Sequence, residues 1–107
     1  MVVKNSEVSF DYLDEKSRRK VLAHDGSMMM VEVTFDKDGK GSIHTHPHEQ
    51  ITYVAKGSFV FTIDGVEHPV VQGDSLYFPS NTPHGCTALE DGILVDIFTP
   101  QRQDFLK

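Results

Sequence analysis

Apolar and polar residues alternate along most of this chain, in short stretches separated by breaks that contain glycine, aspartate or proline. The alternation repeats every second residue. That period predicts β-strands, because successive side chains of a strand point to opposite faces of the sheet. The expected strands cover residues 19–24, 28–35, 42–46, 50–55, 58–63, 66–71, 75–78, 84–89 and 93–99.

Turn signals between these strands support the same interpretation. Lys56-Gly57 and Asp64-Gly65 predict hairpins, and Asp-Gly suits a type I′ turn because both of its central residues need a positive φ. Only residues 6–16 and the last few residues could be helical. Many short strands without a repeat, linker or low-complexity tract predict an all-β sandwich or barrel. A chain of 107 residues fits one domain, 1–107, with one core.

Some of the expected strands are apolar on both faces. If Gln50 and Thr52 point inward, then Ile51 and Tyr53 point outward. A strand that is apolar on both faces is normally covered on both sides. In a one-domain protein the second cover is another subunit, so we expect a homodimer.

Composition narrows the classes of partner and compartment. The formal charge of −6 disfavours nucleic acid, whose affinity for proteins comes mainly from lysine and arginine on phosphates. Arg18-Arg19-Lys20 is the only basic cluster, and we interpret it as a solvated turn. The apolar runs are too short for a membrane span, and residues 1–20 have no apolar signal-peptide core. With a single cysteine, this pattern predicts a cytoplasmic protein.

Three histidines in five residues form the strongest chemical signal of the chain. His44 and His46 are two residues apart, so on an extended strand they share a face and can bind one metal at about 2.0–2.2 Å. Gln50 begins the next strand and could add an amide oxygen, and His84 arrives from a later strand. His48 could replace His46, although Pro47 breaks the alternation before it. Cys86 either faces the metal with His84 or is a small buried core residue.

The chain resembles the cupin superfamily through two motifs. The first is an HxH motif, which here runs His44-Thr45-His46, three residues, Gln50, six residues, Gly57. The second runs Gly73, five residues, Pro79-Ser80-Asn81, two residues, His84, with Asn81 in place of a glycine. The resemblance implies a double-stranded β-helix, or jelly-roll barrel, that holds one divalent metal through His44, His46, Gln50 and His84.

Gln50 stands where most cupins have a glutamate. A glutamine brings no charge, so a divalent metal bound by it and three neutral imidazoles keeps its +2 charge. Such a site attracts an anionic ligand such as a carboxylate and polarises a bound oxygen. The set of ligands suits Ni, Zn, Fe, Co or Mn, and the sequence does not choose between them.

An acid interrupts the last apolar strand. Either Asp96 faces solvent while Ile93, Val95 and Ile97 face the core, or Asp96 faces the mouth of the barrel, where it could move protons. Arg102 follows that strand. Its planar fork could bind a substrate carboxylate, or it could form a surface salt bridge.

The metal segment and the tail Asp96-x-Phe98-x-x-x-Arg102 resemble the small cupins of the pectin-degradation (KdgF-like) type. The resemblance implies an enzyme that converts 4,5-unsaturated uronates from pectin or alginate into linear ketonised sugar acids. Asp96 would shuttle protons, Phe98 would pack on the sugar ring and Arg102 would hold the carboxylate. A metal-dependent dioxygenase and a non-catalytic module that binds a small acid are the alternative functions.

Overall fold

The structure is a computed structural model that describes residues 1–106; Lys107, the last residue of the expected domain 1–107, lies outside the described residues. Strands dominate, and the helical segments are single 3₁₀ turns. The elements are η1 (Asn5–Glu7), β1 (Asp11–Asp14), β2 (Ser17–Asp25), β3 (Met28–Phe35), β4 (Lys40–His44), β5 (Glu49–Lys56), β6 (Ser58–Ile63), β7 (Val66–Val71), β8 (Ser75–Phe78), β9 (His84–Ala88), β10 (Gly92–Thr99) and η2 (Gln103–Phe105).

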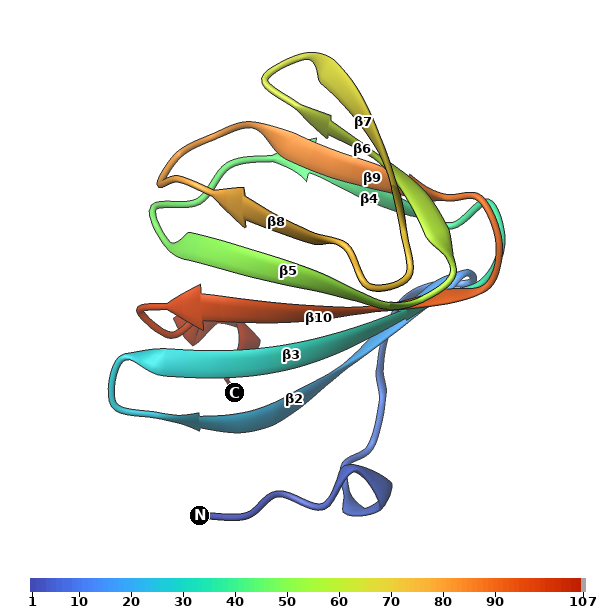
Figure 1. Ribbon diagram of the computed structural model, residues 1–107. Helices are drawn as coiled ribbons and strands as arrows, with labels where there is room; N and C mark the ends of the chain where they lie inside the picture. Colours follow the sequence, from blue (N-terminus) through green and yellow to red (C-terminus); the bar gives the residue numbers. More distant parts are fainter. Residues whose placement is uncertain (107) are drawn as a thin grey trace.

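The strands form two antiparallel sheets. One sheet has the order β1-β2-β3-β10-β5-β8 and the other has the order β4-β9-β6-β7. Figure 1 shows the four-stranded sheet lying over the six-stranded sheet, with the chain crossing repeatedly from one sheet to the other. The predicted all-β class is therefore confirmed.

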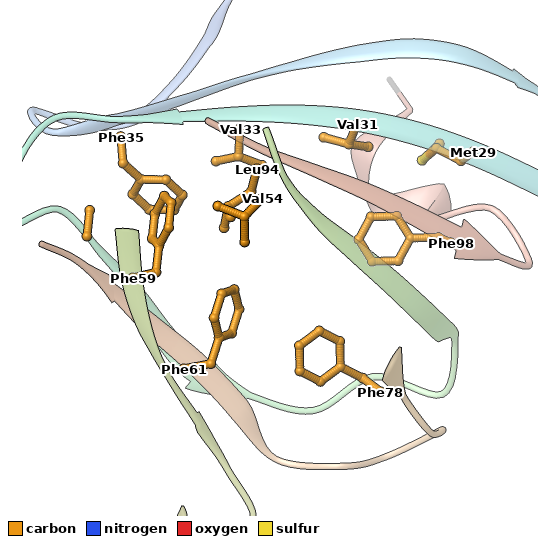
Figure 2. Packing of buried hydrophobic residues seen from close by; sticks show 11 residues of the cluster. Met29, Val31, Val33, Phe35, Val54, Phe59, Phe61, Phe78, Leu94 and Phe98 are labelled. Atoms are coloured by element: carbon orange, nitrogen blue, oxygen red, sulfur yellow. The ribbon is translucent and has the colours of Figure 1, made fainter. Parts of the chain in front are cut away.

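The core lies between the two sheets. Phe59 and Phe61 project from β6 towards Phe35, Val54 and Leu94 of the six-stranded sheet (Figure 2). Phe78 and Phe98 extend this layer towards the end of the barrel where β5 and β9 begin. Each of these side chains is at most 4% exposed. A packed aromatic layer of this kind holds the strands that carry the site in fixed positions.

The sequence pattern gave four strands with their observed bounds: β3, β6, β7 and β8. The Asp64-Gly65 hairpin also has the expected geometry, with φ of 49° and 78° at its two residues. On β5, Gln50, Thr52 and Val54 are buried, whereas Ile51 and Tyr53 are exposed, as the alternation predicts.

Three details differ from the sequence predictions. Residues 6–16 are not helical beyond η1; β1 pairs with β2 through a turn in which the Lys16 amide donates to the Asp14 carboxylate at 2.8 Å. The basic cluster lies on β2 rather than in a solvated turn. The strand expected to reach His46 ends at His44. Within the described part of the chain, no helix is long and apolar enough to cross a membrane.

Candidate metal centre

Three imidazoles converge at one end of the barrel. His44 ends β4, His84 begins β9 opposite it, and His46 lies on the connection between β4 and β5. The ring centroids are 4.6 Å apart for His44 and His84, 5.0 Å for His46 and His84, and 5.5 Å for His44 and His46. One nitrogen of each ring lies within 4.8 Å of the other two. This cluster could hold a metal ion.

Backbone carbonyls set the tautomer of all three rings. The Nδ1–H of His44 donates to the Ser42 carbonyl at 2.7 Å. That of His46 donates to the His48 carbonyl at 3.0 Å, and that of His84 donates to the Thr82 carbonyl at 2.8 Å. A carbonyl can only accept, so each Nδ1 carries the proton and each Nε2 offers a lone pair. Metal-binding histidines are oriented in the same way.

His84 has an unsatisfied nitrogen. Its Nε2 is buried and has no hydrogen-bond partner among residues 1–106. Burial, with smaller contributions from the neighbouring His44 and His46, lowers the pKa of His84 to about 4. The ring is therefore neutral near pH 7, with a buried lone pair that a cation would satisfy.

Gln50 brings a fourth donor to the cluster. Its Oε1 lies 2.9 Å from Nε2 of His46, and its amide N–H donates to the Thr52 hydroxyl at 2.9 Å. Because Nδ1 of His46 carries the proton, two acceptors face each other across that 2.9 Å gap. A proton on Nε2 or a metal ion would relieve this repulsion. Burial lowers the pKa of His46, which disfavours the proton and favours the metal.

A hydrogen-bond chain fixes the direction of that amide. The Thr52 hydroxyl donates to the Asp96 carboxylate at 2.7 Å, so its oxygen accepts from Gln50. The Gln50 nitrogen is thereby held at Thr52 and the Gln50 oxygen is aimed at the metal cluster. A glutamate at position 50 would have no N–H for Thr52 and would bring a second carboxylate close to Asp96. This accounts for the departure from the glutamate of most cupins.

Two local features of the backbone bring the histidines together. Asn81 adopts φ of 60°, and its amide donates to the His46 carbonyl at 2.8 Å, which ties the two histidine segments. A Cβ at Gly85 would lie 2.7 Å from the Gly41 carbonyl oxygen, so glycine permits β4 and β9 to approach closely. Phe78 stacks on His84 at 4.4 Å, and Phe98 meets His46 edge-on at 5.6 Å.

A cavity of about 210 Å³ opens beside the cluster. This is below the roughly 300–1,000 Å³ of pockets for drug-sized ligands, so the cavity suits a small molecule. His44 is exposed and borders it. The chemically capable residues around it are Arg19, His44, Gln50, His84, Cys86, Asp96 and Arg102, and the apolar ones include Leu13, Val33, Phe61, Leu94, Phe98 and Phe105.

Asp96 faces the interior and not solvent. It borders the cavity on the same face of β10 as the core residues Leu94 and Phe98. Burial raises the pKa of Asp96 to about 6, against the lowering effects of the hydrogen bonds from Thr52 and Gln50. A carboxyl group with this pKa can both accept and release a proton near neutral pH.

Arg102 lies at the edge of the cavity and forms a salt bridge. Its Nε and a terminal nitrogen donate to the two oxygens of Asp104 at 3.0 and 2.9 Å. The Arg102 side chain is 12% exposed and that of Asp104 is 61% exposed. Both sequence interpretations of Arg102 therefore have a structural counterpart: it is ion-paired, and it also borders the cavity.

The two open questions about the sequence have structural answers. The cluster contains His46 and not His48, whose backbone carbonyl instead accepts from His46. Cys86 packs against the core and also borders the cavity, and burial raises the pKa of its thiol to about 12.

Sequence reasoning missed Thr52 and Arg19. The available signal for each was its strand face: Thr52 shares a face with Gln50, and Arg19 shares a face with Val21.

Comparisons with known proteins agree with this architecture. The family profile described as "Cupin domain" matches residues 31–98. The chain is 38% identical over 104 residues to the pectin degradation protein KdgF of Dickeya dadantii (strain 3937), which covers 95% of this chain and 94% of that protein.

Two solved structures match almost the whole chain. The structure of KdgF from Halomonas sp. has a TM-score of 0.94 and 35% identity, covering 99% of this chain and 98% of that one. An RmlC-like cupin from Shewanella frigidimarina NCIMB 400 has a TM-score of 0.94 and 32% identity, covering 98% and 95%. The predicted double-stranded β-helix of cupins is therefore confirmed.

Proposed function

Since this chain belongs to the cupin family, with a sequence closely similar to KdgF, we propose that it is a metal-dependent enzyme that opens 4,5-unsaturated uronates to linear ketonised sugar acids. The observation that carries the proposal is the placement of one acid, Asp96, and one arginine, Arg102, around the cavity that the histidine cluster borders. The pectin-degradation role in the name of the relative supports the choice of substrate class.

We propose that His44, His46 and His84 hold one divalent transition metal through Nε2, together with Oε1 of Gln50. The buried lone pair on His84 and the facing acceptors of His46 and Gln50 fit such an ion. When bound, the metal would supply a Lewis acid that polarises sugar oxygens. Neutral ligands leave its charge intact, which favours a substrate with a carboxylate.

Asp96 carries the proton transfers in this proposal. The substrate ring is an enol ether closed by a hemiacetal. Asp96 takes the proton of the anomeric hydroxyl, the bond between the anomeric carbon and the ring oxygen breaks, and an aldehyde and an enolate result. Asp96 then returns the proton to the alkene carbon distal to the carboxylate, which leaves a ketone. The net reaction is an isomerisation with no redox change.

Arg102 and Phe98 position the substrate. Arg102 offers a planar pair of N–H groups to the sugar carboxylate, in place of the exposed Asp104 that it now holds. The Phe98 ring borders the cavity, with the guanidinium carbon of Arg102 5.3 Å from its centre, and offers an apolar surface to the sugar. Both residues thereby keep the enol ether next to Asp96.

The test is incubation of metal-loaded protein with 4,5-unsaturated galacturonate, followed by the ultraviolet absorbance of its conjugated double bond. The absorbance should fall faster than in buffer. Asp96→Ala should keep its metal and lose turnover, whereas Glu67→Gln, which removes an exposed carboxylate of β7, should keep both. No acceleration by metal-loaded wild type contradicts the proposal, and a fully active Asp96→Ala variant contradicts the role of Asp96.

The same assay separates this function from oxygenase chemistry. A protein loaded with zinc, which does not change its oxidation state, should be active if the reaction is an isomerisation. Activity that appears only with iron and consumes oxygen would instead support the dioxygenase alternative.

We also propose that the protein is a homodimer joined through the outer face of the six-stranded sheet. Ile51 and Tyr53 of β5 and Tyr77 of β8 are 48%, 47% and 54% exposed, and they adjoin Ile97 of β10. An exposed apolar patch of this kind is typical of an interface. Light scattering should give twice the monomer mass for wild type and for Val66→Glu in β7, and the monomer mass for Ile51→Glu. A monomeric wild type would contradict the proposal.

A further inference from the structure

Arg19 is a cation inside the barrel that the proposed reaction has not used. It lies on β2 opposite Val33, and it shares its inward face with Ser17 and with Val21, which is partly buried and packs against the core. Its side chain borders the cavity, and its guanidinium carbon lies 3.7 Å from the centre of the Phe105 ring. An arginine on an inward-pointing strand face is rare without a partner for its charge.

The polar partners of Arg19 are incomplete. Its Nε is buried and has no hydrogen-bond partner within residues 1–106, and the guanidinium forms no salt bridge in that part of the chain. Burial lowers the pKa of Arg19, the charge of Asp11 opposes this effect, and the charge of Arg102 adds to it. A buried N–H without an acceptor is a position where a ligand oxygen would be stabilised.

Arg19 and Arg102 flank the same aromatic ring. The guanidinium carbon of Arg102 lies 4.3 Å from the centre of the Phe105 ring, and that of Arg19 lies 3.7 Å from it. The only salt bridge of this pair in the described chain joins Arg102 to the exposed Asp104. Two like charges therefore border one cavity. Asp11, Asp96 and Asp104 lie near them, but none of these acids forms a salt bridge with Arg19 in the described chain, so an anion that reaches both guanidinium groups would be attracted by both.

We propose that Arg19 is a second carboxylate-binding residue, which together with Arg102 selects an acidic sugar over its neutral counterpart. The proposal rests on the uronate function above and deepens it. A carboxylate has enough lone pairs to accept from both guanidinium groups, so one ligand carboxylate can accept from Arg19 and compete with Asp104 for Arg102. Phe105 holds the two arginines in place through its ring faces.

Equilibrium binding tests this role without turnover. The probes are galacturonate and its uncharged methyl ester, titrated calorimetrically into metal-loaded protein. Arg19→Met should weaken galacturonate binding about 10- to 100-fold, because a charge-assisted hydrogen bond is lost, and should leave binding of the ester unchanged. Arg19→Lys keeps the charge without the planar fork, so its affinity for galacturonate should lie between those of wild type and Arg19→Met. Arg18→Met is the matched control, since Arg18 is the neighbouring β2 residue and pairs with Asp36.

Each outcome decides between the two proposals. If Arg19→Met binds galacturonate as wild type does, or if Arg18→Met loses as much affinity, the role of Arg19 is wrong and the uronate reaction is untouched. If wild type binds neither probe, the role of Arg19 is also wrong. If binding of galacturonate depends on Arg19 but unsaturated galacturonate is not turned over, the arginine pair is supported and the catalytic proposal fails. Metal content equal to that of wild type shows that each variant is folded.

Discussion

Thr52 links a proposed metal ligand to the proposed acid, and its replacement by valine tests that link. Thr52 is 0% exposed. Its hydroxyl accepts from Gln50 at 2.9 Å and donates to Asp96 at 2.7 Å. Valine has a similar shape but no hydroxyl, so the amide and the carboxyl would each lose a buried partner.

The structure gives the size of both effects of Thr52→Val. Each buried polar group left unpaired costs about 1–3 kcal/mol, so with two such groups the free energy of unfolding of the metal-free protein should fall by about 2–6 kcal/mol. That loss lowers Tm by roughly 10–30 °C in a domain of this size. The Gln50 oxygen is then no longer aimed at the cluster, and metal affinity should fall about 10- to 100-fold, as for other residues that orient metal ligands.

Two assays read these effects separately. Thermal unfolding followed by circular dichroism, with chelator present, gives the stability, and competition with a chromophoric chelator gives the metal affinity. Thr34→Val is the matched control, because Thr34 lies on β3 between the buried Val33 and Phe35 and points outward. If Thr52→Val matches this control in both assays, the hydrogen-bond chain does not orient Gln50 and the reasoning is refuted.

Three other substitutions address charge in and around the cavity. Gln50→Glu should lower the free energy of unfolding of the metal-free protein by about 1–3 kcal/mol, because a carboxylate cannot donate to Thr52. Bound metal should restore part of the lost stability. Unfolding with and without chelator measures the loss and the recovery. The pKa of Asp96 is about 6 in the folded protein, whereas that of an unfolded aspartate is near 3.8. The folded state therefore holds this proton more tightly, and metal-free wild type should lose stability as the pH rises from about 4 to 6. Asp96→Asn should lack that component in a pH series of unfolding curves. Asp104→Asn should lower KM for the uronate up to about fivefold, because an exposed ion pair that competes for Arg102 contributes about 0–1 kcal/mol; an unchanged KM would show that Asp104 does not compete.

The strands and the histidine cluster could be predicted because both depend on local patterns. Alternation and Asp-Gly turns give strand bounds directly, as at β6 and β7. The spacing of His44 and His46, together with a turn before His84, is enough to suggest a shared ligand. The ring of His46, however, reaches the cluster from a connection rather than a strand, with its Nδ1 held by the His48 carbonyl. That geometry depends on the loop containing Pro47 and is not encoded by the period of the strand.

The links around the site could not be predicted because they depend on register between distant strands. Thr52 and Asp96 are 44 residues apart and meet because β5 pairs with β10 at that position. Arg19 faces the cavity because it pairs opposite Val33, whereas a shift of one residue would place it on the outer face. In the sequence, Arg19 is the middle of a basic cluster, and its alternation with Val21 does not show which of the two faces of the strand points inward.

The central claim is that four side chains share one cation, and anomalous X-ray diffraction from crystals of nickel-loaded protein tests it most directly. One anomalous peak per chain should lie about 2.0–2.2 Å from Nε2 of His44, His46 and His84, with Oε1 of Gln50 in the same sphere. A peak elsewhere, or one bound through an Nδ1 atom, would contradict the account.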